Sequence, residues 1–319
     1  MGVRVIVCAA SLAGAIVFTG CSPRYVTARP ADVVRAAVPA AAVTTNVLLV
    51  SIDGLRPDAI ERFAAEHLQR LMREGSYSLS ARTILPSKTL PSHTSMLTGE
   101  PPEDHGVLWN DVMSAQTDVV ETPTVFGVAR AHGYRTAAFF SKAKFGPLQR
   151  PGTLDYSQAP GGWFGRWSSD RTVGDVRSYL EKEKPNLLFV HLSDPDRAGH
   201  STGWMSDAYG HAVRSTDAAL GALLVAAESA YGRGNYSVLV TADHGGHAFD
   251  HGSDDPLDVT IPWIAWGRGV VAGALKDVEI QTFDTAPTVL WLLGIEEPEA
   301  WDGSPVRAAF QAFQPIATE

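Results

Sequence analysis

NVLLVSIDG, residues 46–54, is a mostly apolar run that ends in Asp53 and Gly54. Because its apolar residues are continuous and do not alternate with polar ones, the run is typical of a strand buried on both faces. Similar runs occur at residues 135–140, 186–192 and 236–242, with a shorter one at 261–266. We therefore predict a strand in each of these segments.

Helical patterns separate these predicted strands. They occur at residues 58–73, 91–98, 122–132, 170–183, 207–229 and 285–293. Gly75 and Gly99 stand just past the first two patterns, where glycine commonly ends a helix. The alternation of strands and helices predicts an α/β fold in which a mostly parallel central sheet carries helices on both faces. In such sheets, binding sites gather beyond the carboxyl ends of the strands.

Acidic residues and histidines follow three of the predicted strands. One aspartate after a strand is usually a helix cap or a turn residue, but three strand ends with Asp, two of them with His, indicate more. Carboxylate and imidazole together suit zinc, with manganese or iron as competitors. The residues concerned are Asp53, Asp194, Asp196, His200, Asp243, His244, His247 and His251.

A hydroxyl group lies at the start of another predicted helix. The segment 88–94 reads KTLPSHT, which places Thr89 just before the helix at 91–98. Free backbone N–H groups and the helix dipole favour an anion at this end of a helix. A threonine hydroxyl beside a metal ion can be activated there as a nucleophile, although an N-cap is the simpler role for Thr89 taken alone.

Taken together and in order, these motifs resemble the alkaline phosphatase superfamily, and within it the type I phosphodiesterase / nucleotide pyrophosphatase family. The resemblance covers residues 46 to about 295 and implies an alkaline-phosphatase-like three-layer sandwich. The matching motifs are Asp53-Gly54, the segment 88–93, Thr98-Gly99, His105-Gly106, Asn110, the segment 195–200, Asp243-His244-Gly245 and His251-Gly252.

The resemblance also implies a role for each matching position. Asp196, His200 and His251 would hold one Zn²⁺. Asp53, Asp243 and His244 would hold a second, with Thr89 against it, and Mn²⁺ or Fe could take one of the two sites. Asn110 and the backbone N–H of Thr89 would donate to a phosphate oxygen. The implied reaction transfers a phosphoryl group to Thr89, and water then hydrolyses the phospho-threonine.

Some assignments stay open at this point. His247 is an alternative to His251 as the third ligand of the first metal, although the family's ligand stands in a His-Gly pair, as His251 does. We expect Asp194 to lie behind the ligands, and His93 and His105 to brace loops. Trp109 and the aromatic segment 161–167 could stack on a flat leaving group or could fill the edge of the domain.

The substrate class follows from the resemblance only in outline. A sulfatase needs Cys or Ser where this chain has Thr89, so sulfatase activity is not expected. We predict a hydrolase of phosphodiesters or nucleotide pyrophosphates acting on a small phosphorylated substrate. The alternatives are a phosphomonoesterase, a phosphonate hydrolase and, from a different class, a lipid-anchored binding protein without catalysis.

The first 45 residues differ from the rest of the chain. Arg4, an apolar run over residues 5–18 and the small residues before Cys21 are typical of an export signal at 1–21. The Gly-Cys ending resembles a bacterial lipobox, which would make Cys21 the lipidated first residue of a membrane-anchored periplasmic protein. Because Phe18 departs from that pattern, a plain signal peptide or an uncleaved anchor stays an alternative.

The remaining chain divides simply. Residues 22–45, rich in Ala, Pro and Thr, are predicted to be a flexible tether, and residues 46–319 a single catalytic domain. The formal net charge of the chain is -9 and no run of Lys or Arg stands out, so we expect no binding of a nucleic-acid polymer. The oligomeric state stays open.

Overall fold

The computed structural model describes residues 24–25, 42–111, 120–162 and 165–311. A single nine-stranded sheet runs through it in the order β1-β5-β4-β6-β2-β7-β8-β3-β9. The strands are β1 (Arg24–Tyr25), β2 (Val47–Ile52), β3 (Ser76–Arg82), β4 (Thr136–Phe139), β5 (Tyr156–Gln158), β6 (Leu187–Leu192), β7 (Ser237–Thr241), β8 (Thr260–Gly267) and β9 (Gly273–Ala274).

The middle of the sheet is parallel. β2 lies between β6 and β7, and all three strands run in the same direction, as do β4 and β5 beyond β6. Every residue of β2, β6 and β7 is buried, which explains why their sequences are continuous apolar runs. The carboxyl ends of these three strands therefore meet at one edge of the sheet.

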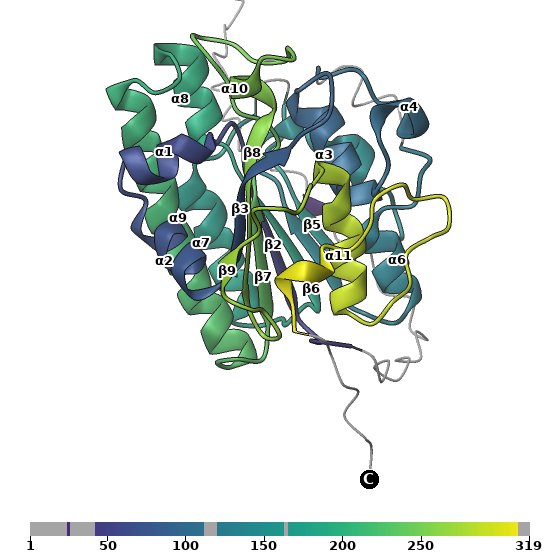
Figure 1. Ribbon diagram of the computed structural model, residues 1–319. Helices are drawn as coiled ribbons and strands as arrows, with labels where there is room; N and C mark the ends of the chain where they lie inside the picture. The colour runs from purple at the N-terminus through teal and green to yellow at the C-terminus, as the bar shows by residue number, and fades with distance from the viewer. Residues whose placement is uncertain (1–23, 26–41, 112–119, 163–164, 312–319) are drawn as a thin grey trace, which may run out of the picture.

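Helices cover both faces of the sheet and complete a three-layer sandwich (Figure 1). One layer contains α1 (Pro57–Arg62), α2 (Glu66–Glu74), α7 (Ser169–Leu180), α8 (Asp194–Thr202) and α9 (Asp207–Tyr231). The opposite layer contains α3 (Thr89–Thr98), α4 (Pro102–His105), α6 (Val125–Ala131) and α11 (Thr285–Leu292). Shorter elements are α10 (Pro256–Val259) and the 3-10 turns η1 (Ala143–Leu148), η2 (Thr282–Asp284) and η3 (Arg307–Ala309). The α/β sandwich predicted from the sequence is thus confirmed.

Two predicted elements differ from the structure. The single helix predicted at 58–73 is broken into α1 and α2, because Ala64 adopts a left-handed conformation with φ of 52°. The segment after β6, where no helix was predicted, is helix α8 from Asp194 to Thr202. Pro195 in the first turn, and two aspartates there that favour the positive end of the helix dipole, account for this start.

The sequence missed β3 and β9 on the far side of the sheet, whereas the strand predicted at 261–266 is β8. β8 pairs antiparallel with both β7 and β3, and β9 adds to β3. β3 reads SYSLSAR and alternates only partly between buried and exposed positions, so it lacks the apolar run that marked the central strands.

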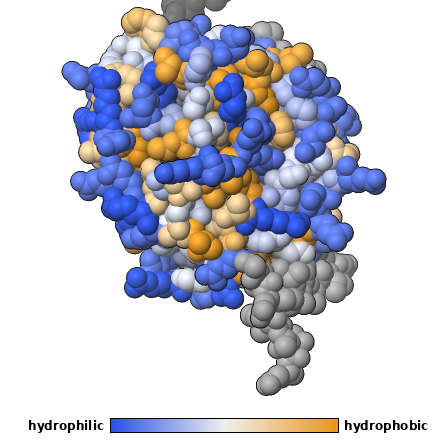
Figure 2. Space-filling model, viewed as in Figure 1, coloured by the Kyte–Doolittle hydropathy of each residue, from blue (hydrophilic) through white to orange (hydrophobic). Residues whose placement is uncertain are grey.

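The N-terminal features lie mostly outside the described residues, including the predicted signal at 1–21 with Cys21. Within the predicted tether, Arg24–Tyr25 pairs antiparallel with β5, and Val43 and Thr44 are buried beside the sheet. Among the described helices, none combines the length and apolar character that crossing a membrane requires. On the face in Figure 2, hydrophobic residues form groups interrupted by hydrophilic side chains.

Candidate active site

Three aspartates meet at the carboxyl edge of the central strands. Asp53 follows β2, Asp243 follows β7, and Asp196 lies in the first turn of α8 just beyond β6. The backbone joins them, because Asp196 N donates to Asp53 O at 3.0 Å and Gly54 N donates to Asp243 Oδ1 at 3.1 Å. All three carboxyl groups are buried. Such a cluster of negative charge in a dry interior needs cations close by.

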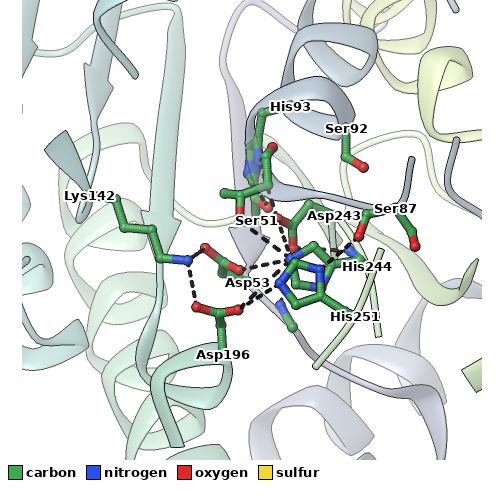
Figure 3. A network of polar contacts seen from close by, with 12 residues as sticks. Ser51, Asp53, Ser87, Ser92, His93, Lys142, Asp196, Asp243, His244 and His251 are labelled. Atoms are coloured by element: carbon green, nitrogen blue, oxygen red, sulfur yellow. Dashed lines mark hydrogen bonds and ion pairs between the residues drawn. The ribbon is translucent and has the colours of Figure 1, made fainter. Parts of the chain in front are cut away.

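Each of these carboxylates has one oxygen that the protein satisfies and one that it does not. Asp53 Oδ2 and Asp196 Oδ2 contact the Lys142 ammonium at 2.5 and 2.6 Å (Figure 3). Asp243 Oδ1 accepts hydrogen bonds from two backbone N–H groups. By contrast, Asp53 Oδ1, Asp196 Oδ1 and Asp243 Oδ2 are buried and have no hydrogen-bond partner among the residues that the structure describes. Buried oxygens are rarely left in this state, so their position fits ligands of a metal ion.

Three histidines show the same one-sided arrangement. The Nδ1 atoms of His200, His244 and His251 lie 2.8–2.9 Å from backbone carbonyls, those of Phe249, Gly245 and Ser87. An Nδ1–H that donates to a carbonyl fixes the tautomer and leaves the Nε2 lone pair available. Metal-binding histidines are commonly oriented in this way. All three Nε2 atoms lie within 3.4 to 3.6 Å of an aspartate oxygen in the cluster.

These side chains form two groups with the spacing of metal ligands. One comprises Asp196, His200 and His251, and the other Asp53, Asp196 and His244. Within each group the ligand atoms lie within 4.8 Å of one another, and Asp196 belongs to both. Asp243 Oδ2 adds to the second group, since it lies 3.3 Å from His244 Nε2. The cluster is therefore consistent with a bimetallic site, and its nitrogen and oxygen donors suit zinc.

The electrostatics point the same way. Burial alone would raise the pKa of Asp53, but Lys142, His191 and His244 outweigh it and hold that pKa well below its ordinary value. Asp243 has less help, so burial and the charge of Asp53 raise its pKa to about 7. A divalent cation between these carboxylates would neutralise the remaining negative charge.

Thr89 lies at the edge of this cluster. It is the first residue of α3, which begins two residues earlier than predicted and is buried throughout. Thr89 Oγ1 lies 3.4 Å from His244 Nε2, and the Thr89 carbonyl lies 2.7 Å from His93 Nδ1. His93 Nε2 in turn lies 2.8 Å from Ser51 Oγ on β2. The threonine is thus held against the sheet at the N-terminal end of a helix, where an anion is favoured.

Asn110 lies beside the same helix end. Its Oδ1 atom accepts a hydrogen bond of 2.9 Å from Leu90 N, the residue after Thr89. The side chain is thereby placed next to the candidate nucleophile. The structure brings Asn110 together with Thr89 and the six predicted metal ligands.

The geometry separates the two histidines that the sequence left as alternatives. His251 Nε2 lies 3.1 Å from His200 Nε2 and 3.6 Å from Asp196 Oδ1. His247 instead places Nδ1 2.7 Å from Asp258 Oδ1, and its side chain is 42% exposed. His247 therefore supports the loop that carries His251.

Substituting each histidine tests this difference. We expect His251→Ala to lower the zinc content of the purified protein by about one ion per chain, because it removes a ligand from one group. His247→Ala is the matched control, and we expect it to retain the wild-type content. Elemental analysis after dialysis against zinc measures both. A loss of zinc in the His247 variant alone would contradict the assignment.

Sequence reasoning missed two buried side chains of this site. Lys142 follows β4 and contacts Asp53 and Asp196, and His191 on β6 lies 2.9 Å from Asp53 Oδ2 and 2.8 Å from Ser141 Oγ. Both signals were present, since a lysine follows one apolar strand and a histidine interrupts another. Neither Lys142 nor His191 stands in a metal-ligand pattern, so the sequence alone does not identify them as site residues.

The other predicted residues lie nearby with supporting contacts. His105 Nε2 lies 2.9 Å from Ser95 Oγ on α3. Asp194 accepts hydrogen bonds from Ser169 N and from Arg197, so it joins α8 to α7. Of the aromatic segment 161–167, Trp167 is buried, and residues 163–164 lie outside the described chain.

Comparisons with known proteins cover most of the chain. The model of the family described as type I phosphodiesterase / nucleotide pyrophosphatase matches residues 47–272. A bis(5'-adenosyl)-triphosphatase of Xenopus laevis is 26% identical over 219 residues, which are 63% of this chain and 47% of that protein. The human ectonucleotide pyrophosphatase/phosphodiesterase family member 5 is 26% identical over 218 residues, 63% of this chain and 44% of its own. The chain thus spans about half the length of these curated relatives.

Solved structures show the same fold. Murine ectonucleotide pyrophosphatase/phosphodiesterase 5 superposes with a TM-score of 0.70 at 17% identity, covering 83% of this chain and 100% of that one. An inactive threonine-to-alanine variant of the murine protein in complex with AMP gives 0.69 at 18% identity, covering 83% and 99%. A 2-O glycosaminoglycan sulfatase gives 0.68 at 17% identity, covering 86% and 76%.

Proposed function

Because this chain belongs to the type I phosphodiesterase / nucleotide pyrophosphatase family, a family of hydrolases, we propose that it cleaves phosphoester bonds by transferring the phosphoryl group to Thr89. The observation that carries the proposal is the position of the Thr89 hydroxyl. It lies 3.4 Å from His244 Nε2 at the start of α3. His244 belongs to the cluster with three buried carboxylate oxygens that have no hydrogen-bond partner in the described part of the chain. A nucleophile and a cation site are thus adjacent.

The residues of the site divide the work. Asp196, His200 and His251 would hold one Zn²⁺, and Asp53, Asp243 and His244 the other. When bound, the two ions supply Lewis-acid stabilisation of charge on the attacking and leaving oxygens.

Thr89 Oγ1 loses its proton and bonds to phosphorus while the bond to the leaving group breaks on the opposite side, and the leaving group takes up a proton; this gives phospho-threonine. Water then attacks the same phosphorus, the bond from phosphorus to Thr89 Oγ1 breaks, the phosphorylated product is released, and Oγ1 regains a proton. Asn110 supports both steps, because its amide N–H groups can donate to a phosphoryl oxygen while its carbonyl is held by Leu90 N.

Small phosphorylated compounds, with phosphodiesters and nucleotide pyrophosphates first, are the proposed substrates. The support comes from relatives, one of which is named a bis(5'-adenosyl)-triphosphatase and another of which is described in complex with AMP. A phosphomonoesterase is the second candidate. Lys144 Nζ lies 3.1 Å from Asn110 Oδ1 and adds positive charge where a phosphoryl group would lie.

Hydrolysis of nitrophenyl esters tests the function. We expect the zinc-loaded protein to release nitrophenol from bis(4-nitrophenyl) phosphate and from a nucleotide nitrophenyl ester. We also expect a chelator to abolish the release and added zinc to restore it. The matched reaction with 4-nitrophenyl phosphate compares diester with monoester. No turnover of any of these esters by the zinc-replete protein would contradict the proposal.

A further inference from the structure

The Asn110 carbonyl oxygen accepts two hydrogen bonds. One comes from Leu90 N at 2.9 Å and the other from Lys144 Nζ at 3.1 Å. Both partners are donors, so the atom between them must be the oxygen of the amide, and the orientation of the side chain is fixed. Within the described residues, Asn110 has no further hydrogen bond, which leaves both N–H groups of its Nδ2 atom available to an acceptor in the site.

Lys144 brings a positive charge to this position. It lies on η1, two residues after Lys142, and it is half-buried. Burial and the neighbouring ammonium of Lys142 lower the pKa of Lys144 to about 8, with a smaller contribution from Arg166. The chain as a whole is acidic, with a formal net charge of -9, so these cations do not reflect a general excess of basic residues. Lys142, Lys144 and Arg166 therefore make one side of the site locally basic.

Lys144 has a different environment from Lys142. Lys142 contacts Asp53 and Asp196 at 2.5 and 2.6 Å and is neutralised by them. Lys144 has only the neutral carbonyl of Asn110 as its hydrogen-bond partner in the described part of the chain. An ammonium group with a neutral partner keeps donors and charge for an incoming anion.

We propose that Lys144 is a specificity-determining residue that favours transferred phosphoryl groups carrying two negative charges, as in phosphomonoesters, over the single charge of phosphodiesters. This inference rests on the proposed function. In it, Lys144 sets the ratio of phosphomonoesterase to phosphodiesterase activity. A monoester presents three non-bridging oxygens, whereas a diester replaces one of them with an ester substituent. A cation beside Asn110 gains more from the additional charged oxygen than from the substituent.

Substitution of Lys144 tests the ratio directly. We expect Lys144→Met to lower kcat/KM for 4-nitrophenyl phosphate by about 10-fold or more, since a charge-assisted hydrogen bond is lost. For bis(4-nitrophenyl) phosphate we expect a change within about 3-fold, because that substrate offers less charge at this position. Lys144→Arg should keep most of the wild-type ratio. Lys276→Met, at an exposed residue beyond β9, is the control for loss of a lysine.

Two outcomes overturn the inference. If Lys144→Met lowers both reactions equally, the lysine only positions Asn110; if it changes neither, the charge has no role. Binding of inorganic phosphate to the zinc-loaded protein, measured by calorimetry, gives a readout that does not depend on turnover. We expect the Lys144→Met variant to bind phosphate about 10-fold more weakly, and equal affinity would overturn the inference. A wild-type protein that binds phosphate but hydrolyses neither ester would refute the proposed function and leave the role of Lys144 measurable.

Discussion

Thr89→Ala should abolish hydrolysis of phosphoesters while the fold and the metal content stay intact. We expect kcat to fall by about 10³-fold or more, because the variant loses the oxygen that attacks phosphorus. Among the described residues, the Thr89 side chain makes one hydrogen-bond contact, at 3.4 Å to His244 Nε2, so we expect its removal to disturb the fold little. Steady-state kinetics with a nitrophenyl diester measures the loss.

Two controls give this result its meaning. Thr89→Ser keeps a hydroxyl and should retain a measurable part of the activity. Zinc content and the thermal midpoint of Thr89→Ala should match the wild type, which would show that the loss is chemical. Normal turnover by Thr89→Ala would rule out the phospho-threonine mechanism.

Lys142→Met should have the largest effect on stability. The Lys142 side chain is 3% exposed, and its ammonium holds one oxygen each of Asp53 and Asp196. Removing one partner from a buried ion pair leaves uncompensated charge and typically costs about 3–5 kcal/mol. We expect a loss of this size in the free energy of unfolding of the metal-free protein, measured by urea denaturation.

The metal-loaded protein provides the comparison for this variant. With cations at the inner oxygens of Asp53 and Asp196, the loss of the Lys142 charge should be smaller. Lys276→Met, at an exposed position, should leave the free energy of unfolding unchanged in both forms. Equal stability of wild type and Lys142→Met without metal would show that the lysine does not stabilise the carboxylate cluster.

The central strands could be predicted because their burial requires apolar residues, and these are visible in the sequence. Strands β2, β6 and β7 are buried on both faces, and such an environment favours mostly apolar runs. β3 escaped prediction because it is partly exposed and rich in serine. The break between α1 and α2 could not be predicted either, because alanine has no side-chain feature that favours the left-handed conformation that Ala64 adopts.

The aspartates that meet at the edge of the sheet could be predicted from the sequence for a similar reason. Asp53 and Asp243 directly follow parallel neighbouring strands, so topology alone brings them together. Lys142 and Lys144 follow β4, which is separated from β2 by β6. Their approach to Asp53 and Asn110 depends on how the chain turns after β4, and no local pattern encodes that turn. Roles taken from family resemblance could not include them, because they belong to no motif that was matched.

The two predicted metal sites differ in how readily the surrounding chain can open to release an ion. Asp53, Asp243 and His244 are fully buried beside strands at the centre of the sheet, whereas the His200 side chain is 37% exposed on α8 and His251 lies on a loop. Fluctuations that open a helix end or a loop occur far more often than those that separate central strands. An ion bound by His200 and His251 would therefore be released through brief local opening. An ion bound by Asp53, Asp243 and His244 would be released only by a larger opening of the central strands, and we expect it to exchange more slowly.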